Sequence, residues 1–213
     1  ELVRSMLDLG AVRREGNRAV VAAVAALRTV PATVQDMIQA RIARLDVASR
    51  GLLELAAVIG TEAPLAILRA AAPETSPREL LERLEAAELV TERALPEPAL
   101  AFKHALTREV AYAGLVPERR RTLHARVVRA IEHAYGERAG EQIEQLAHHA
   151  FQGELWDRAV GYLRQAGIRA TARSNNDQAV TFLEQALHAI EQTPEGPERT
   201  AEAIDARFEL RNA

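Results

Sequence analysis

The sequence predicts a mostly α-helical protein, and its composition is the first reason for this prediction. Apolar residues make up 48% of the 213 residues, whereas aromatic residues make up only 4%. Alanine, leucine, arginine and glutamate dominate, and these residue types favour helices packed on helices over a β-sandwich. A chain of this length allows one large domain or two of about 100 to 150 residues, each with its own core, and we expect two.

The first segment, residues 1–30, is expected to contain the end of a helix and a small β-hairpin. Residues 1–9 have a helical pattern that closes at Gly10, and residues 11–20 are typical of a hairpin that turns near Gly16. The chain starts inside this helical pattern and without an initiator methionine. We therefore expect it to be a fragment of a longer protein.

Four helices are expected next, because start and stop signals recur along residues 31–89. Apolar residues follow each signal at helical spacing, and the second helix is expected to end at Gly60 and the fourth at Leu89. The expected starts are Thr33 as a cap, Asp46, Pro64 in a first turn, and the capping box Ser76-Pro77-Arg78-Glu79.

The pattern then changes to two short strands, residues 89–93 and 99–103, separated by a proline-rich turn. Helices followed by such a hairpin are typical of a winged helix. Two further helices, residues 106–115 and 118–134, complete this part of the chain. The sequence therefore predicts a winged-helix regulatory domain with a small β-hairpin wing over residues 31–135.

Residues 136–213 contain an internal repeat, because Asp157–Ala166 recurs in kind as Asp177–Ala186. Its spacing fits a tetratricopeptide unit of about 34 residues, which predicts the start of a tetratricopeptide-like α-solenoid. A single unit cannot bury its faces alone, so helices at 141–153 and 199–211 should flank it, with more repeats beyond the chain. The expected contact positions are Leu163, Ala166, Gly167 and Ala170 on the first helix and Ala179, Leu183 and Ala186 on the second.

Charge and cysteine content limit the classes of function. The formal net charge is −3, so no global basic field would hold nucleic acid or an anionic membrane. No apolar run approaches the roughly 20 residues of a membrane-spanning helix, and we expect no membrane partner. The chain has no cysteine, which excludes disulfides and thiolate chemistry and makes a cytoplasmic location the default.

The segment Phe102–Tyr112 is the strongest functional candidate, because it ends a strand on His104 and then opens a helix. An imidazole at such a strand end can donate a hydrogen bond to a phosphate oxygen, and the neighbouring Lys103 could add charge. The alternative is a structural histidine that bonds to backbone at the strand–helix junction. In an alternating strand, Lys103 would point away from His104.

Several segments together resemble the signal-transduction ATPases with numerous domains, the STAND class, over nearly the whole chain. The resemblance lies in the order and spacing of these segments, as in bacterial members whose ATPase core precedes them. The segments are Val30–Gln35, Ala40–Leu45, Ala56–Gly60, Phe102–Leu106 with Glu109–Tyr112, Arg120–His124, and Leu146–His149 before the tetratricopeptide-like helices.

This resemblance implies a winged helix between a nucleotide-binding core and a helical-repeat sensor. In plant and animal relatives, a Met-His-Asp motif in the winged helix touches the β-phosphate of bound ADP. Lys103-His104-Ala105 is similar to that motif, with Lys103 in place of methionine and Ala105 in place of aspartate. The implied nucleotide phosphate sensor is therefore His104, with Lys103 as a secondary candidate.

The nucleotide itself is expected in a missing upstream domain. A phosphate-binding loop needs a glycine-rich stretch followed by lysine, yet Lys103 is the only lysine among 27 basic residues and no such loop surrounds it. We expect no enzymatic activity and no cofactor in this fragment, and ATP or ADP with magnesium in the upstream ATPase core. The expected partners are that core in the same chain and a protein or small-molecule signal on the repeats.

The expected output is a class III adenylate or guanylate cyclase, since similar proteins are often fused to one; others carry a LuxR-type DNA-binding domain or a protein kinase. Two other functions stay open, a DNA-binding transcription regulator and a plain tetratricopeptide scaffold. Direct DNA binding is disfavoured, because the helix that would enter the groove is acidic and would repel phosphate. Its charged residues are Glu79, Glu82, Glu85 and Glu88 against Arg78 and Arg83.

No metal site is predicted. His148 and His149 are adjacent, so on a helix they point about 100 degrees apart, and no carboxylate lies at ligand spacing. One of them is expected to pack between the winged helix and the repeats, and His124 and His133 to be surface or packing residues. The basic run 119–121 could face DNA, an acidic partner or the nucleotide-binding core, but a solvated face is the commoner role and is expected here. Core packing is the expected role of Trp156, Tyr162 and Phe182.

Overall fold

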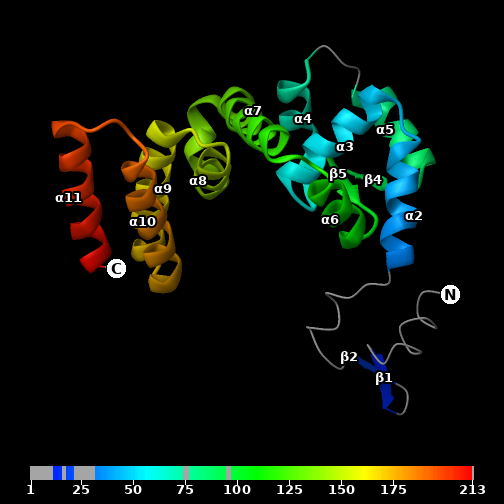
Figure 1. The fold of residues 1–213 in the computed structure, drawn as a ribbon, viewed down its shortest axis with the longest axis horizontal. Helices are drawn as coiled ribbons and strands as arrows, with labels where there is room; N and C mark the ends of the chain where they lie inside the picture. Colours follow the sequence, from blue (N-terminus) through cyan, green and yellow to red (C-terminus); the bar gives the residue numbers. More distant parts are fainter. Residues whose placement is uncertain (1–11, 16–17, 22–31, 74–76, 95–96, 213) are drawn as a thin grey trace. The chain divides into compact units, whose positions relative to one another are not determined.

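The computed structural model describes most of the chain as helices, with a small three-stranded sheet and a separate hairpin (Figure 1). The described residues are 12–15, 18–21, 32–73, 77–94 and 97–212. The chain divides into two compact units, Glu1–Arg44 and Leu45–Ala213, and each is described here by itself. The mostly α fold class is confirmed, whereas the predicted domain limits at residues 30/31 and 135/136 stay predictions.

The first unit contains the predicted hairpin. Strands β1 (Val12–Glu15) and β2 (Arg18–Val21) pair antiparallel along their whole length. Helix α2 (Ala32–Ala43) follows. Because α2 begins at Ala32, Thr33 is its second residue, and the prediction of Thr33 as the cap is wrong by two residues. The helix predicted over residues 1–9 lies outside the described residues.

The second unit opens with helix α3 (Val47–Ile59), whose two ends are those predicted. The Asp46 carboxylate accepts hydrogen bonds from the Ser49 backbone N–H at 2.9 Å and from the Ser49 hydroxyl at 2.7 Å. These bonds lower the pKa of Asp46 to about 2, because they favour the charged carboxylate. At the other end, the Gly60 N–H donates to the Ala56 carbonyl, which closes the helix.

A short strand that the sequence analysis missed follows α3. Strand β3 (Glu62–Pro64) precedes helix α4 (Leu65–Ala71), so Pro64 lies before the helix and not in its first turn. Three residues are too few to show an alternating pattern, and the strand forms because β5 offers it an antiparallel partner.

Helix α5 (Pro77–Ala86) begins with proline at its first position, as predicted, although Ser76 lies outside the described residues. The helix was expected to reach Leu89 but ends three residues earlier. Glu88 has φ 57°, in the left-handed region, which stops the helix before the next strand.

The three-stranded sheet has the order β3-β5-β4, and every neighbouring pair is antiparallel. Strands β4 (Val90–Arg93) and β5 (Ala99–Phe102) are the two predicted strands. The central strand β5 is buried at its first three residues, with Leu100 fully inaccessible. The sheet therefore holds the end of β5 in a fixed place, next to the residues that follow it.

Two helices follow the sheet, and both were predicted to within two residues. They are α6 (Ala105–Ala113) and the longer α7 (Pro117–Tyr135). Helix α7 packs against α3 and α4 and also against α8 (Ile143–Gln152), which follows the short 3₁₀ helix η2 (Gly136–Gln142). Its fully buried Leu123 and Ile131 belong to these contacts.

The rest of the chain is a series of helices in which each packs on the next (Figure 1). Helices α9 (Trp156–Ala172), α10 (Asn176–Glu191) and α11 (Pro197–Asn212) follow α8. The flanking helices predicted at 141–153 and 199–211 correspond to α8 and α11. Within the described ranges, no helix has both the length and the apolar character needed to cross a bilayer.

Helices α9 and α10 pack closely at Gly167. A Cβ atom built on Gly167 would lie 2.7 Å from Leu183 Cγ and 2.9 Å from its Cδ2. Leu183 is 1% exposed, so it has no open space into which it can move. Every small or apolar residue that the sequence analysis placed between these two helices is buried.

Alanine substitutions at two glycines of α9 are therefore expected to change the stability of the protein in opposite directions. Gly161→Ala meets no atom within 4 Å and should stabilise the protein by about 0.5–1 kcal/mol, because alanine favours the helix. Gly167→Ala should destabilise it by about 1 kcal/mol or more, since overpacking against Leu183 outweighs the same gain. Urea denaturation of the two variants and the wild-type chain measures the difference. Equal stabilisation by both alanines would contradict the close packing of α9 on α10.

The three aromatic residues expected in the core are each half-buried. Trp156 meets Phe151 edge to face, with ring centroids 5.8 Å apart. Tyr162 donates a hydrogen bond from its hydroxyl to Glu132 of α7. These residues pack at the edges of helix contacts, where one side of each ring meets neighbouring helices.

Candidate functional site

His104 lies at the junction between β5 and α6, where the sequence analysis placed it. Its backbone is extended, with φ −137° and ψ 136°, and its carbonyl accepts a hydrogen bond from Thr107 N–H at 3.0 Å. The imidazole makes no capping hydrogen bond to α6 and is exposed. A histidine in this state can meet a ligand or another domain, because its own helix does not use the ring.

Lys103 precedes this histidine and is also exposed. Strand β5 ends at Phe102, so Lys103 already lies outside the strand. Its backbone N–H donates to the Leu89 carbonyl at 3.2 Å, which ties the junction to the residue before β4. The junction therefore presents two exposed basic-type side chains on a backbone that the sheet holds.

The arginine run 119–121 was expected to be a solvated face; the Arg119 and Arg121 side chains are 44% and 42% exposed, and each arginine also has a partner within the chain. Arg119 pairs with Glu54 of α3 at 3.2 Å, and Arg121 pairs with Glu154 at 2.8 Å. Arg120 donates to the Tyr112 and Leu115 carbonyls at the end of α6, both at 3.3 Å. The run therefore connects α7 to three neighbouring parts of the fold.

Tyr112 lies between two arginines. The Arg120 guanidinium is 4.4 Å from the centre of the Tyr112 ring, and that of Arg108 is 5.8 Å from it. Arg108 also donates from Nε to the Ala57 carbonyl at 3.1 Å, near the end of α3. These contacts fix the tyrosine ring, whose hydroxyl then reaches α7.

A cluster of three histidines forms where α7 meets α8. His124 comes from α7, and His148 and His149 come from α8. The Nδ1 atoms of His124 and His149 are 2.8 Å apart, and the Tyr112 hydroxyl is 3.1 Å from His124 Nε2. His124 and His149 are 1% and 2% exposed, whereas His148 is exposed.

Burial controls the charge of this histidine cluster. It lowers the pKa of His149 to about 2 and that of His124 to about 4, and the positive charges of neighbouring groups add to both effects. The pKa of His148 is lowered as well, first because the neighbouring residues partly desolvate its ring although the residue is exposed, and then by the charge of Arg108. All three imidazoles are therefore neutral at pH 7, so each has one nitrogen with an available lone pair.

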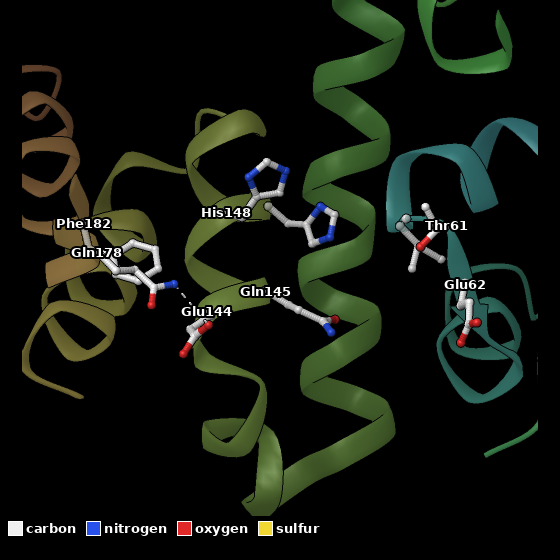
Figure 2. A pocket seen from close by; sticks show the side chains of 10 residues that line it. Thr61, Glu62, Glu144, Gln145, His148, Gln178 and Phe182 are labelled. Carbon is white, nitrogen blue, oxygen red and sulfur yellow. Dashed lines mark hydrogen bonds between the residues drawn. The ribbon is translucent and has the colours of Figure 1, made fainter. Parts of the chain in front are cut away.

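An open pocket of about 490 Å³ lies next to the cluster (Figure 2). Its polar side chains come from three elements: Thr61 and Glu62 at β3, Glu144, Gln145 and His148 on α8, and Gln178 on α10. Gln178 donates to Glu144 at 3.5 Å. The pocket gives solvent and small solutes access to the exposed edge of the histidine cluster.

Only part of this histidine cluster was predicted from the sequence. His149 is a buried packing residue, as one of the pair was expected to be, and His124 packs there too. The meeting of His124 with the pair was missed, because residues 25 positions apart have no local spacing signal. The signal that could have found it is that two consecutive helices joined by a few residues tend to pack on each other.

Comparison with known proteins finds similarity to one much longer protein. An uncharacterized protein of Rhizobium meliloti (strain 1021) is 31% identical to this chain over 174 residues, which cover 80% of the chain. The aligned residues cover 17% of that protein's length. No family model matches the chain, and no solved structure matches it. In the Rhizobium protein, the similar region is therefore one part of a larger polypeptide.

Proposed function

We propose that this chain is the regulatory and signal-sensing segment of a STAND-type signal-transduction ATPase and acts in the cytoplasm. Its first part reports the nucleotide state of an upstream ATP-binding core, and its helical repeats receive a protein or small-molecule signal. The segment itself catalyses no reaction. The observation that carries this proposal is the exposed His104 imidazole, which lies at the junction between β5 and α6 and does not cap its own helix.

The order of elements before His104 supports a winged helix. Helix α3, strand β3, helices α4 and α5, and the hairpin β4–β5 follow one another, and the sheet order is β3-β5-β4. In this arrangement the turn between β4 and β5 is the wing. His104 then follows the last strand of the winged helix, where the resemblance to STAND proteins implies a contact with the ADP β-phosphate.

The packing of α9 on α10 supports the tetratricopeptide part of the proposal. Gly167 and Ala179 stand at positions where that repeat needs small residues, and both are buried between the helices. Helices α8 and α11 pack on either side of this pair. Such a series can add further units, and its exposed faces are the proposed surface for the signal.

The larger context of the proposal is a multidomain protein. ATP or ADP with magnesium would bind in the upstream core, and an adenylate or guanylate cyclase is the proposed output. The length of the Rhizobium relative leaves room for such domains outside the similar region. Binding of a signal to the repeats would change the affinity of the core for nucleotide, and nucleotide would change the affinity for the signal by the same factor.

A DNA-binding role is less well supported. In a winged helix that reads DNA, α5 would enter the major groove. Glu79 and Glu82 are exposed on this helix, and the half-buried Glu85 accepts a hydrogen bond from Glu92 N–H in the hairpin. A helix with this charge repels the phosphate backbone, so the proposed function includes no DNA contact.

The test uses the longer polypeptide that includes the upstream core. His104→Ala should speed ADP release about 10-fold or more, because a hydrogen bond to a charged phosphate contributes about 1.5–3 kcal/mol. Stopped-flow fluorescence of a labelled ADP measures this rate. His133→Ala, on the exposed side of α7, is the matched control and should leave the rate unchanged.

The same experiment separates the alternatives. Equal ADP release from the His104→Ala variant and the wild-type protein would remove the sensor role and leave a plain repeat scaffold. A salt-dependent gel shift with the 213-residue chain tests the transcription-regulator alternative, and a specific, salt-sensitive complex would contradict the proposed function.

A further inference from the structure

We infer that His124, His148 and His149 form a binding site for a divalent transition metal ion, of which Zn²⁺ is the best match, at the contact between α7 and α8. The inference does not depend on the nucleotide role of His104. Each histidine offers one nitrogen, and the three ligand atoms lie within 4.8 Å of one another.

The geometry is close to that of a three-histidine zinc site. Zinc bonds to imidazole nitrogen at about 2.0–2.1 Å, so two such ligands in a tetrahedral site lie about 3.4 Å apart. His124 Nδ1 and His149 Nδ1 are 2.8 Å apart, and a small outward rotation of the two rings gives this spacing. His148 is exposed and can adjust its ring to complete the set.

The donor set selects the class of metal. Within the described residues, the cluster consists of imidazoles alone and contains no carboxylate. Imidazole suits zinc, copper and nickel, whereas calcium and magnesium require oxygen ligands. Lowered pKa values support the same choice, because neutral histidines keep a lone pair for a metal at pH 7.

Tyr112 supplies the outer contact that zinc-binding histidines usually have. Its hydroxyl is 3.1 Å from His124 Nε2, so it can accept a hydrogen bond from Nε2–H and leave Nδ1 unprotonated. Arg120 and Arg108 hold the tyrosine ring in place. In the metal-free protein, one of the two facing Nδ1 atoms carries a proton, and that histidine changes to the Nε2–H tautomer when the metal binds.

The surrounding charge decides which fourth ligand fits. Arg108 and Arg120 are the cations nearest the cluster, and they oppose a dication to some extent. They also favour an anion, so the fourth position, which opens on the pocket, suits hydroxide or a carboxylate from solution. The pocket carboxylates of Glu62 and Glu144 offset part of the positive charge. The proposed zinc site therefore has three protein ligands and one open position.

The test measures zinc bound to the 213-residue chain. The chain is treated with EDTA, dialysed against zinc at pH 7.5 beside a competing chelator of known affinity, and analysed for metal content. We expect about one zinc ion per chain. His148→Ala should lower the affinity at least about 10-fold and should still fold, because the His148 side chain is exposed. Circular dichroism checks the fold of each variant.

His133→Ala is the matched control, since it removes an exposed histidine from α7 outside the cluster and should bind zinc like the wild-type chain. Cobalt gives a second readout, because a tetrahedral Co²⁺ site has strong visible absorption that His148→Ala should weaken. Equal zinc binding by the wild-type chain and His148→Ala, or no stoichiometric binding by either, overturns the inference.

Discussion

Acidification from pH 7 to pH 5 is expected to cost the metal-free protein on the order of 3 kcal/mol of unfolding free energy through the buried histidine pair. His124 and His149 have folded-state pKa values of about 4 and about 2, below the usual 6.5 that applies to the unfolded chain. The unfolded chain therefore binds protons first as the pH falls. The contribution is complete above pH 6.5 and is lost progressively as the pH drops toward the folded-state values.

Urea denaturation at pH 7 and pH 5, in EDTA, measures this loss. His148 also faces the pair, with its ring centroid 5.7 Å from that of His124 and 5.1 Å from that of His149, and its lowered pKa means that it adds to the dependence in the same direction. His149→Leu removes one titrating group but keeps an apolar side chain, so its stability should depend less on pH than that of the wild-type chain. His133→Ala should keep the full dependence. An unchanged pH dependence in His149→Leu would show that the buried pair is not its source.

Gly153→Ala is expected to destabilise the protein by about 1–3 kcal/mol and to weaken zinc binding. A Cβ atom on Gly153 would lie 2.8 Å from Ala125 N and 2.9 Å from the His149 carbonyl oxygen. Both contacts are backbone atoms of helices, which cannot rotate away as a side chain can. The methyl group would therefore push α7 and α8 apart next to His124 and His149.

Gly140→Ala is the control for this variant, since a Cβ atom there meets nothing within 4 Å. Thermal unfolding of both variants, together with their zinc content after dialysis, measures the two effects. A Gly153→Ala protein as stable as the wild-type chain would mean that the two helices can separate there at no cost. In that case the histidine cluster would have no rigid frame.

The elements that could be predicted from the sequence are those with strong local signals. Asp46 and Gly60 limit α3 as expected, because a side-chain cap and a glycine act within one turn of the helix. The contact positions of the repeat, such as Gly167 and Leu183, were also predictable, because small residues recur at fixed spacing.

The elements that could not be predicted depend on distant partners. Strand β3 exists because β5 pairs with it, and Glu88 ends α5 in a left-handed conformation that glutamate rarely adopts. The candidate sites also differ in whether their signal is local or depends on distant residues. His104 was found because its strand–helix junction is local, whereas the cluster of His124 with His149 requires two helices to pack.

Helix α7 forms hydrogen bonds and ion pairs with the elements on two of its sides. Arg126 donates to the Ala71 carbonyl at the end of α4, and Arg119 pairs with Glu54 of α3. Toward the repeats, Glu132 pairs with Arg158 of α9, and Arg121 pairs with Glu154.

A helix of 19 residues is about 28 Å long and stiff, so a tilt of about 5° around one end moves the other by about 2.5 Å. That distance exceeds the tolerance of a hydrogen bond. A tilt of α7 that is too small to unfold any helix would therefore break its polar contacts with α3 and α4.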